Sequence, residues 1–449
     1  MKTSRVVGIA ILAYFLYFAI GALRSGFSPD DMMNLRYYYE RGLPLTLWNN
    51  VEFWSHAYRP MAGLYYLPVY YAFGLNPLPF RIVYLLILGA NVFLSYRIAE
   101  VLTRSQAAAA LTAVVVCAHA GMVAIYYTGG FIYDVAAYFF TALMLFLYMR
   151  VRSQGLHLNA IQSAAVVCAY VAALNSKEIA VVGAGWILAY EFLLGRPRKL
   201  LLPLMMMALA LIYTIGKLVG PGSLAQEPGY RTDLSFHRYF WNNRIYVNDI
   251  LYTGFFNFTT GRTLVIAWII LTLACWRANK SEVWWCWFLV STATLGVSFT
   301  VVPRNGPGLY IPLLAWALLI SVLVTALFER PAWRWGAAAA LAFSFSYMTV
   351  HHWRERTYPM LEEQRGVSSI IAQLRDLGKQ PAPYGSAIFL NNPLPEFETY
   401  FIARLVWKDR TIRIELANMM HPSPTPAEVD HFDWVLAFDG PRLQVVRAP

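Results

Sequence analysis

Charged residues stand beside several apolar segments of this chain, where a bare charge is costly. Asp30 and Asp31 follow the first apolar run in FSPDDMMNLRYYYERG, and Asp134 opens a later run in YYTGGFIYDVAAYFF. Lys177 and Glu178 lie between two further runs in AALNSKEIAVVGAGW. Ionisable groups in or against a membrane are expensive and are commonly functional. These residues are therefore the first candidates for chemistry.

The residue types suit one kind of reaction. A carboxylate can accept a proton from an acceptor hydroxyl. A lysine or arginine can hold a phosphate and neutralise the charge that grows on a phosphate leaving group. Lys177 and Arg304, the latter in VVPRNGPGLYIPL, are the cations closest to such a role.

Each group also has a structural explanation. The adjacent aspartates Asp30 and Asp31 follow Ser-Pro and could cap the next helix, because short carboxylates accept the free N–H groups of a helix start. Lys177 and Glu178 could form an ion pair that ties two helices together, and Arg304 could reach the lipid headgroups. Asp134 is harder to explain in this way, since a lone carboxylate in an apolar span needs a partner, a proton or a ligand.

The elements that position these residues are membrane helices. The chain is 58% hydrophobic and 14% charged, whereas soluble domains carry about 25% charged residues. About eleven apolar stretches approach the ~20 residues that cross a hydrocarbon core. They are 6–23, 80–102, 107–127, 131–149, 160–175, 178–194, 199–219, 262–276, 282–302, 308–328 and 332–350.

Basic residues in the short connections set the orientation. If the amino terminus is cytoplasmic, five successive cytoplasmic loops each carry at least two lysines or arginines, as the positive-inside tendency expects. The pairs are Arg97/Arg104, Arg150/Arg152, Arg196/Arg198 with Lys199, Arg277/Lys280 and Arg330/Arg334. The net charge of +11 is therefore a topological signal, and we expect no nucleic-acid partner. All the charged groups described above then fall on the opposite, extracytoplasmic face.

The loops on that face have distinct characters. The segment 60–74 is apolar but short and contains Pro68, and counting it as a span would invert every later loop, so we expect a juxtamembrane helix on the outer face. The loop 220–261 is rich in aromatic and arginine residues and is a candidate lid. We expect residues 1–350 to form the transmembrane domain and 351–449 a small α/β domain outside the membrane.

The ordered set of motifs resembles the C-type integral-membrane glycosyltransferases, especially the protein O-mannosyltransferase and lipid A aminoarabinose transferase branch. The resemblance covers roughly residues 1–200. The stretches that carry it are SPDDMMNLRYYYERG, YRPMAGLYYLPVYYAFGLNPLPFRIVYLLI, YYTGGFIYDVAAYFF and LNSKEIAVVGAGWILAYEFL.

The resemblance implies a hexosyl- or pentosyltransferase that uses a polyprenyl-phosphate sugar donor and inverts the anomeric centre. The position of Asp30 would then be the general base, and Asp31 would position the acceptor or a divalent metal. Asp31 departs from the family, in which glutamate is common at this position, so we leave metal dependence open and expect no other cofactor. Neither the sugar nor the acceptor (a lipid, a glycan or a protein) is specified.

The remaining site positions follow from the same resemblance. Asp134 matches an acidic residue of the active site, and Lys177 matches the contact to the donor phosphate. Arg59 stands where the family has a basic residue before proline, and it would face the phosphate too. Glu178 and Arg304 are secondary members, one acidic and one phosphate-binding.

Two other functions stay open. A transporter or flippase for a lipid-linked or small polar substrate would show repeats and polar groups near the middle of the bilayer, and no repeat is evident here. A structural membrane protein without catalysis is the third interpretation. On the main interpretation the chain is a multi-pass protein of a bacterial-type inner or plasma membrane, with its active site and its carboxy-terminal domain outside the cytoplasm.

Overall fold

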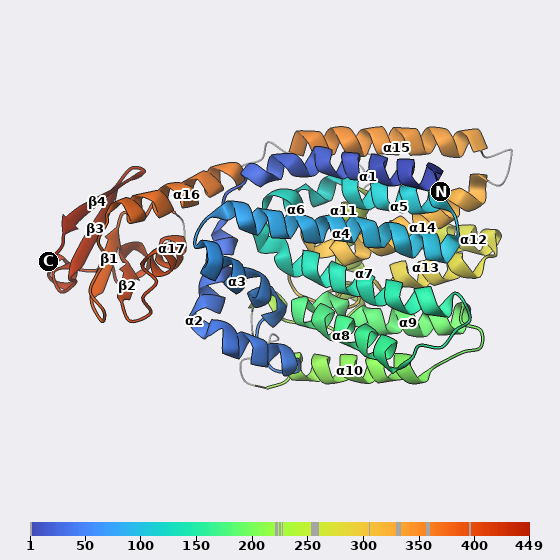
Figure 1. The fold of residues 1–449 in the computed structure, drawn as a ribbon, viewed down its shortest axis with the longest axis horizontal. Helices are drawn as coiled ribbons and strands as arrows, with labels where there is room; N and C mark the ends of the chain where they lie inside the picture. The colour runs from blue at the N-terminus through green and yellow to red at the C-terminus, as the bar shows by residue number, and fades with distance from the viewer. Residues whose placement is uncertain are drawn as a thin grey trace.

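The computed structural model describes residues 2–220, 223, 226, 228–252, 260–304, 306–328, 334–355, 360–394 and 397–449. A bundle of roughly aligned helices forms the larger part, and a small sheet domain lies at one end of it (Figure 1). The amino terminus is at the opposite end of the bundle from this domain. The chain is thus all-helical except for its carboxy-terminal part.

A helix occupies each of the eleven stretches predicted to span the membrane. The bundle helices are α1 (Lys2–Ala19), α4 (Pro77–Thr103), α5 (Gln106–Ala118), α7 (Ile132–Arg152), α8 (Ala160–Ser176), α9 (Val182–Leu193), α10 (Leu201–Leu218), α12 (Gly261–Ala278), α13 (Ser281–Thr292), α14 (Tyr310–Phe328) and α15 (Arg334–Glu355). Within the described residues, six helices are long and apolar enough to cross a membrane, and a bent pair of helices raises this to seven. The polytopic fold is confirmed, and the count of eleven crossings stays a prediction.

Helix α7 lies inside the bundle, packed against α4 and α8. Its neighbours hold it through buried polar contacts. The Asn91 side chain donates to the Val135 carbonyl at 3.0 Å, and the Tyr138 ring stacks on Tyr310 with centroids 4.2 Å apart. Apolar side chains gain little from packing in lipid, so such polar and close contacts specify helix positions. The first turn of α7, which carries Asp134, is therefore firmly placed.

Two helices lie across one end of the bundle, on the side of the sheet domain (Figure 1). Helix α2 (Pro29–Val51) is kinked at Gly42, whose φ is 77°. A short helical turn, η2 (Pro60–Ala62), leads into α3 (Gly63–Phe73). The helix predicted for 60–74 is thus observed.

The carboxy-terminal part contains a four-stranded sheet in the order β2-β1-β3-β4. Its elements are α16 (Met360–Asp376), β1 (Ser386–Leu390), α17 (Glu398–Trp407), β2 (Arg413–Leu416), α18 (Pro426–Val429), β3 (Trp434–Asp439) and β4 (Arg442–Arg447). Strand β1 pairs in parallel with β2 and β3, and β4 is antiparallel to β3. The small α/β fold is confirmed. Helix α15 continues past residue 350 to Glu355, and the domain boundary stays a prediction.

The sheet domain docks on α2 through hydrogen bonds. The Tyr39 hydroxyl donates to the Lys408 carbonyl at 2.6 Å, and the Tyr70 hydroxyl of α3 donates to the Leu405 carbonyl at 2.7 Å. Because α2 also begins with Asp30 and Asp31, the domain is fastened to the helix that presents these carboxylates.

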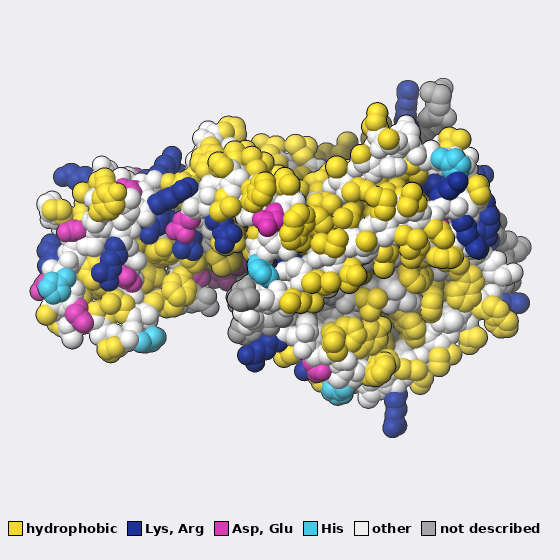
Figure 2. All heavy atoms as spheres, turned by 90° about the horizontal axis from the view of Figure 1, so that it is seen from below, with side chains coloured by type: hydrophobic (Ala, Val, Ile, Leu, Met, Phe, Trp, Pro, Cys, Tyr) yellow, Lys and Arg dark blue, Asp and Glu magenta, His cyan; other side chains and the backbone are white. Residues whose placement is uncertain are grey.

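The face of the bundle seen in Figure 2 is broadly hydrophobic. Lysine and arginine side chains gather at the end of the bundle farthest from the sheet domain, while the sheet domain carries charges of both signs. An apolar belt with a basic end matches the charge asymmetry that the sequence predicts.

Candidate active site

Asp31 is buried, with 2% of its surface exposed, and both of its carboxylate oxygens are used. One oxygen accepts from the Ser28 backbone N–H at 2.9 Å and from the Ser28 hydroxyl at 2.8 Å. The other accepts from the Tyr66 hydroxyl at 2.9 Å, and Arg81 lies 3.7 Å away. With the Ser28 hydroxyl accepting from the Asp31 N–H, these contacts form a capping box. The geometry therefore favours the structural alternative for Asp31.

Replacing Asp31 with alanine is expected to destabilise the protein by about 2–4 kcal/mol, because the cap is lost and Tyr66 and Arg81 lose a buried partner. Thermal unfolding of the purified protein in detergent measures this. Asp30→Ala is the matched control, since Asp30 is exposed and should change stability by less than about 0.5 kcal/mol. Equal melting temperatures for the two variants would contradict the capping role.

Asp30 is exposed at the start of α2 and lies against a glycine pair in the short helical turn just before α7. A Cβ atom on Gly130 would come within 2.7 Å of the Asp30 Cβ, and one on Gly129 would collide with the Asp31 carboxylate. Glycine is thus required at both positions for α2 to approach so closely. Gly130 precedes Asp134 by about one helical turn, so Asp30 lies beside the end of α7 that carries Asp134.

Asp134 and Lys177 form a buried ion pair. Asp134 stands in the first turn of α7, where a carboxylate is favoured by the helix dipole. Lys177 ends α8 in an extended conformation, with φ −162° and ψ 145°, which turns its side chain toward α7. The two side chains are 5% and 8% exposed, respectively. The partner that the sequence required for Asp134 is therefore Lys177.

Arg59 and Glu178 form a second, bidentate pair. The guanidinium donates from Nε and Nη2 to the two Glu178 oxygens at 3.0 and 2.9 Å. Arg59 has a left-handed backbone (φ 43°) before Pro60 and is only 7% exposed. Burial lowers the pKa of the Arg59 guanidinium, but Glu178 and the neighbouring tyrosines raise that pKa well above its usual value. The group is a permanent, oriented cation.

Tyr230 connects Arg59 to Arg304. Its hydroxyl accepts from Arg59 Nη2 at 2.6 Å, and the Arg304 guanidinium lies 4.2 Å from the centre of its ring. Gly308 lies between Arg304 and Lys177, because a Cβ there would be 3.3 Å from the Arg304 Cβ and 3.9 Å from the Lys177 Nζ. Five of the predicted residues are thus gathered at one place: Arg59, Asp134, Lys177, Glu178 and Arg304.

Lys217 is a further cation of this group that sequence reasoning missed. It is 5% exposed, and its Nζ donates to the Ala57 carbonyl at 2.5 Å. A signal was available, because Lys217 is the one charged residue between Leu200 and Val219 in the apolar run 199–219, and such residues are commonly functional. Tyr230 had no comparable signal beyond its place in the aromatic loop 220–261.

A cavity of about 270 Å³ opens beside Glu178, Lys217 and Tyr230, and is called the Lys217 cavity below. Its other walls are mainly apolar, and two of its lining residues, Leu218 and Leu234, are 40% and 80% exposed. The cavity thus joins a charged inner end to the apolar surface of the bundle.

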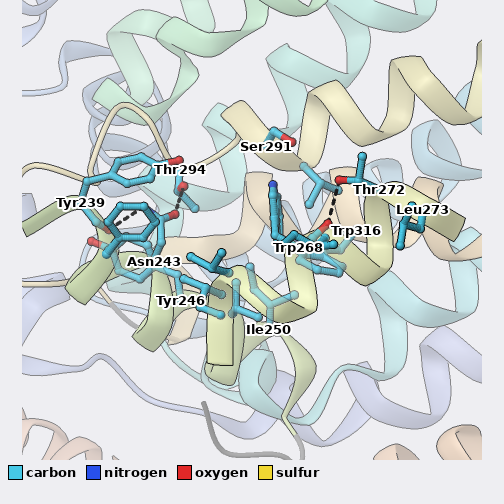
Figure 3. A pocket seen from close by; sticks show the side chains of 16 residues that line it. Tyr239, Asn243, Tyr246, Ile250, Trp268, Thr272, Leu273, Ser291, Thr294 and Trp316 are labelled. Carbon is cyan, nitrogen blue, oxygen red and sulfur yellow. Dashed lines mark hydrogen bonds between the residues drawn. The ribbon is translucent and has the colours of Figure 1, made fainter. Parts of the chain in front are cut away.

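A larger cavity of about 390 Å³ lies between α11 (Phe236–Leu251), α12, α13 and α14 (Figure 3). Trp268 and Trp316 pack against each other with ring centroids 6.0 Å apart, and Tyr239, Asn243 and Thr294 lie together at one end. Its wall includes Tyr246, whose hydroxyl accepts from the Arg304 backbone N–H at 3.2 Å. This tyrosine is thus one contact between the cavity and the charged site.

A chain of tyrosines connects Asp31 of α2 with the cations. Tyr66 donates to Asp31, and its ring stacks on Tyr38 with centroids 6.1 Å apart. The Tyr38 hydroxyl donates to the Tyr133 hydroxyl at 3.2 Å, and the Arg59 guanidinium lies 5.0 Å from the centre of the Tyr133 ring. This packed network fixes the position of Asp31 relative to Arg59.

The aspartate pair is poorly suited to a metal site in this geometry. Both Asp31 oxygens already accept hydrogen bonds, so a cation shared with Asp30 would compete with the helix cap and with Tyr66. The described part of the chain also holds no cluster of three or more His, Cys, Asp or Glu side chains suited to a metal ion. The sequence left metal dependence open, and the reaction proposed below uses side chains alone.

Two solved structures of ArnT from Cupriavidus metallidurans are similar to this chain. The crystal structure of ArnT bound to undecaprenyl phosphate has 12% sequence identity and a TM-score of 0.46, covering 98% of this chain and 96% of that one. The apo crystal structure has 13% identity and a TM-score of 0.49, covering 97% and 92%. No family model matches the sequence, and no curated protein matches it. The case for function therefore depends on the side chains of the site.

Proposed function

We propose that this protein transfers a sugar from a polyprenyl-phosphate donor to an acceptor hydroxyl at the membrane surface. One observation carries the proposal: four cations, Arg59, Lys177, Lys217 and Arg304, form one connected group. Arg59 and Arg304 both contact Tyr230, and Gly308 lies against both Arg304 and Lys177. Tyr230 also lines, with Glu178 and Lys217, a cavity that reaches the apolar surface. A lipid with a phosphate head needs this combination of a cationic pocket and an apolar channel.

The charge balance suits a phosphate leaving group. Asp134 and Glu178 neutralise two of the four cations, so two positive charges are in excess. A sugar phosphodiester carries one negative charge, and the released phosphate monoester carries up to two. The site therefore stabilises the departing phosphate more than the bound donor, and catalysis requires this kind of preferential stabilisation.

Asp30 is the proposed general base. Its carboxylate takes the proton of the acceptor hydroxyl while the acceptor oxygen bonds to the anomeric carbon of the sugar. The bond from that carbon to the phosphate oxygen breaks, and its electron pair stays on the phosphate. Attack from the side opposite the phosphate inverts the anomeric centre. The exposure of Asp30 supports this role, since a base must meet an acceptor that arrives from outside.

The Lys217 cavity is the proposed place for the first isoprene units of the donor. It contacts Glu178, Lys217 and Tyr230 directly, whereas none of these three is among the described lining residues of the cavity in Figure 3, which contacts Arg304 through Tyr246. The site would face the extracytoplasmic side together with the sheet domain, because the basic residues gather at the other end of the bundle (Figure 2).

Transport is the less favoured alternative. Transporters keep their substrate sites near the middle of the bilayer, whereas Asp134 stands in the first turn of α7 and Lys177 at the end of α8. The polar groups therefore lie at helix ends rather than at mid-depth.

Mass spectrometry of lipids that copurify with the full chain tests the proposed donor. We expect polyprenyl phosphate or its glycosylated form to be enriched over bulk phospholipid, and incubation of the purified protein with an acceptor extract to release polyprenyl phosphate. Bulk phospholipid alone, with no release of polyprenyl phosphate, would contradict the proposal.

Lys217→Gln is expected to raise the KM for the lipid donor about tenfold, since one charge-assisted contact to the phosphate is worth roughly 1.5–3 kcal/mol. Lys199→Gln is the matched control. Lys199 is an exposed lysine just before the opposite end of α10, and its replacement should leave KM unchanged. Unchanged kinetics in Lys217→Gln would place the donor phosphate elsewhere.

A further inference from the structure

A polar cavity of about 410 Å³ lies at the end of the bundle opposite the candidate active site. Helix α7 connects the two places, because it begins beside Asp134 and ends at Arg152. Its 21 residues rise about 1.5 Å each, or ~30 Å in all, which is the thickness of a hydrocarbon core. The cavity therefore lies at the level of the headgroups of the other leaflet.

Three arginines line this cavity, one from each of three chain segments: Arg104, Arg152 and Arg196. Arg152 is buried and fully engaged. It donates from Nε and Nη2 to Glu191 at 2.7 and 3.0 Å, so its charge is balanced within the protein. Glu191 also accepts from the Lys199 backbone N–H at 2.7 Å. This network fixes the walls of the cavity rather than offering a charge to a ligand.

Arg104 and Arg196 are different, because they keep most of their donors unused. Arg104 follows α4 in a left-handed conformation, with φ 56°, and is exposed. Within the described residues no hydrogen bond or ion pair of its guanidinium is seen. Arg196 is exposed and donates once, to the Gly195 carbonyl at 2.8 Å. Each guanidinium has five N–H donors, so both can still bind an anion.

The charge of the lining favours an anion. Glu282 is the only carboxylate among the described lining residues, and it offsets one of the two available arginines. One positive charge and a large set of N–H donors remain. Guanidinium groups pair readily with phosphate oxygens through parallel hydrogen bonds. Basic pockets between membrane helices on the cytoplasmic side are suited to lipid phosphates.

We propose that this cavity binds the phosphate of an anionic phospholipid from the leaflet opposite the candidate active site. The acyl chains would lie along the apolar outer surface of α9 and α10, where Phe192 and Leu201 are 45% and 77% exposed. The bound lipid would hold the ends of α4, α7 and α9 together at a point where three helices end. The proposal does not depend on the function proposed for the other end of the bundle.

Thermal unfolding of the purified full chain in detergent, titrated with defined phospholipids, tests this site. Phosphatidylglycerol is expected to raise the melting temperature at concentrations where phosphatidylcholine does not. The double variant Arg104→Gln/Arg196→Gln should need about ten- to thirtyfold more phosphatidylglycerol for the same shift, at ~1 kcal/mol for each basic residue.

Arg97→Gln is the matched control. Arg97 lies on α4 near Arg104 but pairs with Glu100 at 2.9 Å and does not line the cavity, so its variant should respond like the wild type. If the double variant fails to fold, Arg104→Gln alone gives the same comparison, since that side chain is exposed. If inorganic phosphate raised the melting temperature as much as phosphatidylglycerol does, the site would bind anions from solution, and the proposal of a lipid ligand would be overturned. The site would be overturned if phosphatidylglycerol and phosphatidylcholine raised the melting temperature equally. It would also be overturned if phosphatidylglycerol stabilised the double variant and the wild type equally.

Discussion

Asp30→Asn is expected to lower the rate of sugar transfer by about 10²- to 10⁴-fold, the usual contribution of a general base. Asparagine has nearly the same shape as aspartate but cannot take the proton of the acceptor hydroxyl. Because Asp30 is exposed at the start of α2, the substitution should leave the melting temperature and donor binding nearly unchanged. Single-turnover kinetics with saturating donor separate the chemical step from binding.

The neighbouring carboxylate provides a matched control for this prediction. Asp31→Asn alters a buried cap that contacts Ser28 and Tyr66, so it should lower the melting temperature. The activity of the folded fraction should then stay within about tenfold of the wild type, well below the loss expected from removing a general base. A fully active Asp30→Asn enzyme, or a larger loss of activity in folded Asp31→Asn, would exchange the roles assigned to the two aspartates.

Lys177→Met is expected to lower transfer by about 10²- to 10³-fold, comparable to the removal of one preorganised donor from a developing negative charge. It should also destabilise the protein by about 3–5 kcal/mol, because Asp134 is left as an unpaired buried charge. Both effects follow from one ion pair, so a loss of activity alone would not distinguish chemistry from folding.

The double variant Lys177→Met/Asp134→Asn separates the two effects. Removing both charges together takes away the unpaired carboxylate, so most of the lost stability should return. Activity should stay low, because the cation that faces the phosphate is still missing. Recovery of activity together with stability would show that the pair is only a structural tie between α7 and α8.

Much of the fold follows from the sequence for simple physical reasons. Runs of apolar residues long enough to cross a bilayer predict helices, since a lipid environment requires every backbone group to be paired within its own helix. The inner arginines predicted which helix ends face the same side, and the structure indeed gathers Asp134, Lys177 and Arg304 at one end. The same basic residues predicted that 60–74 forms a helix outside the membrane, because counting it as a span would invert every later loop.

Other features depended on contacts between distant segments. The different roles of Asp30 and Asp31 could not be predicted from two identical neighbours, because they depend on the contacts of Tyr66 and Arg81 with Asp31. The position of Tyr230 between two arginines required the loop 220–261 to return to the site. Residues 253–259 of that proposed lid lie outside the described residues, and its closing role stays a prediction.

Arg59 was predicted in part from the sequence, and in part it depends on contacts between distant segments. Its place before Pro60 suggested a phosphate contact through resemblance, and the structure places it in the cationic cluster. Its guanidinium is held by Glu178 and Tyr230, an arrangement that the spacing of 119 residues between Arg59 and Glu178 gives no way to foresee. Glu178 is therefore best viewed as a positioning carboxylate for Arg59.

Binding of polyprenyl phosphate, compared with the uncharged polyprenol of the same length, tests most directly whether these cations form one phosphate site. Native mass spectrometry of the wild type and of Arg304→Gln supplies both comparisons. We predict that the phosphate binds about 10- to 100-fold more tightly than the alcohol, and that Arg304→Gln removes about tenfold of this preference, as loss of a charged hydrogen-bond donor should. Equal binding of phosphate and alcohol by the wild type, or an unchanged preference in Arg304→Gln, would contradict the account.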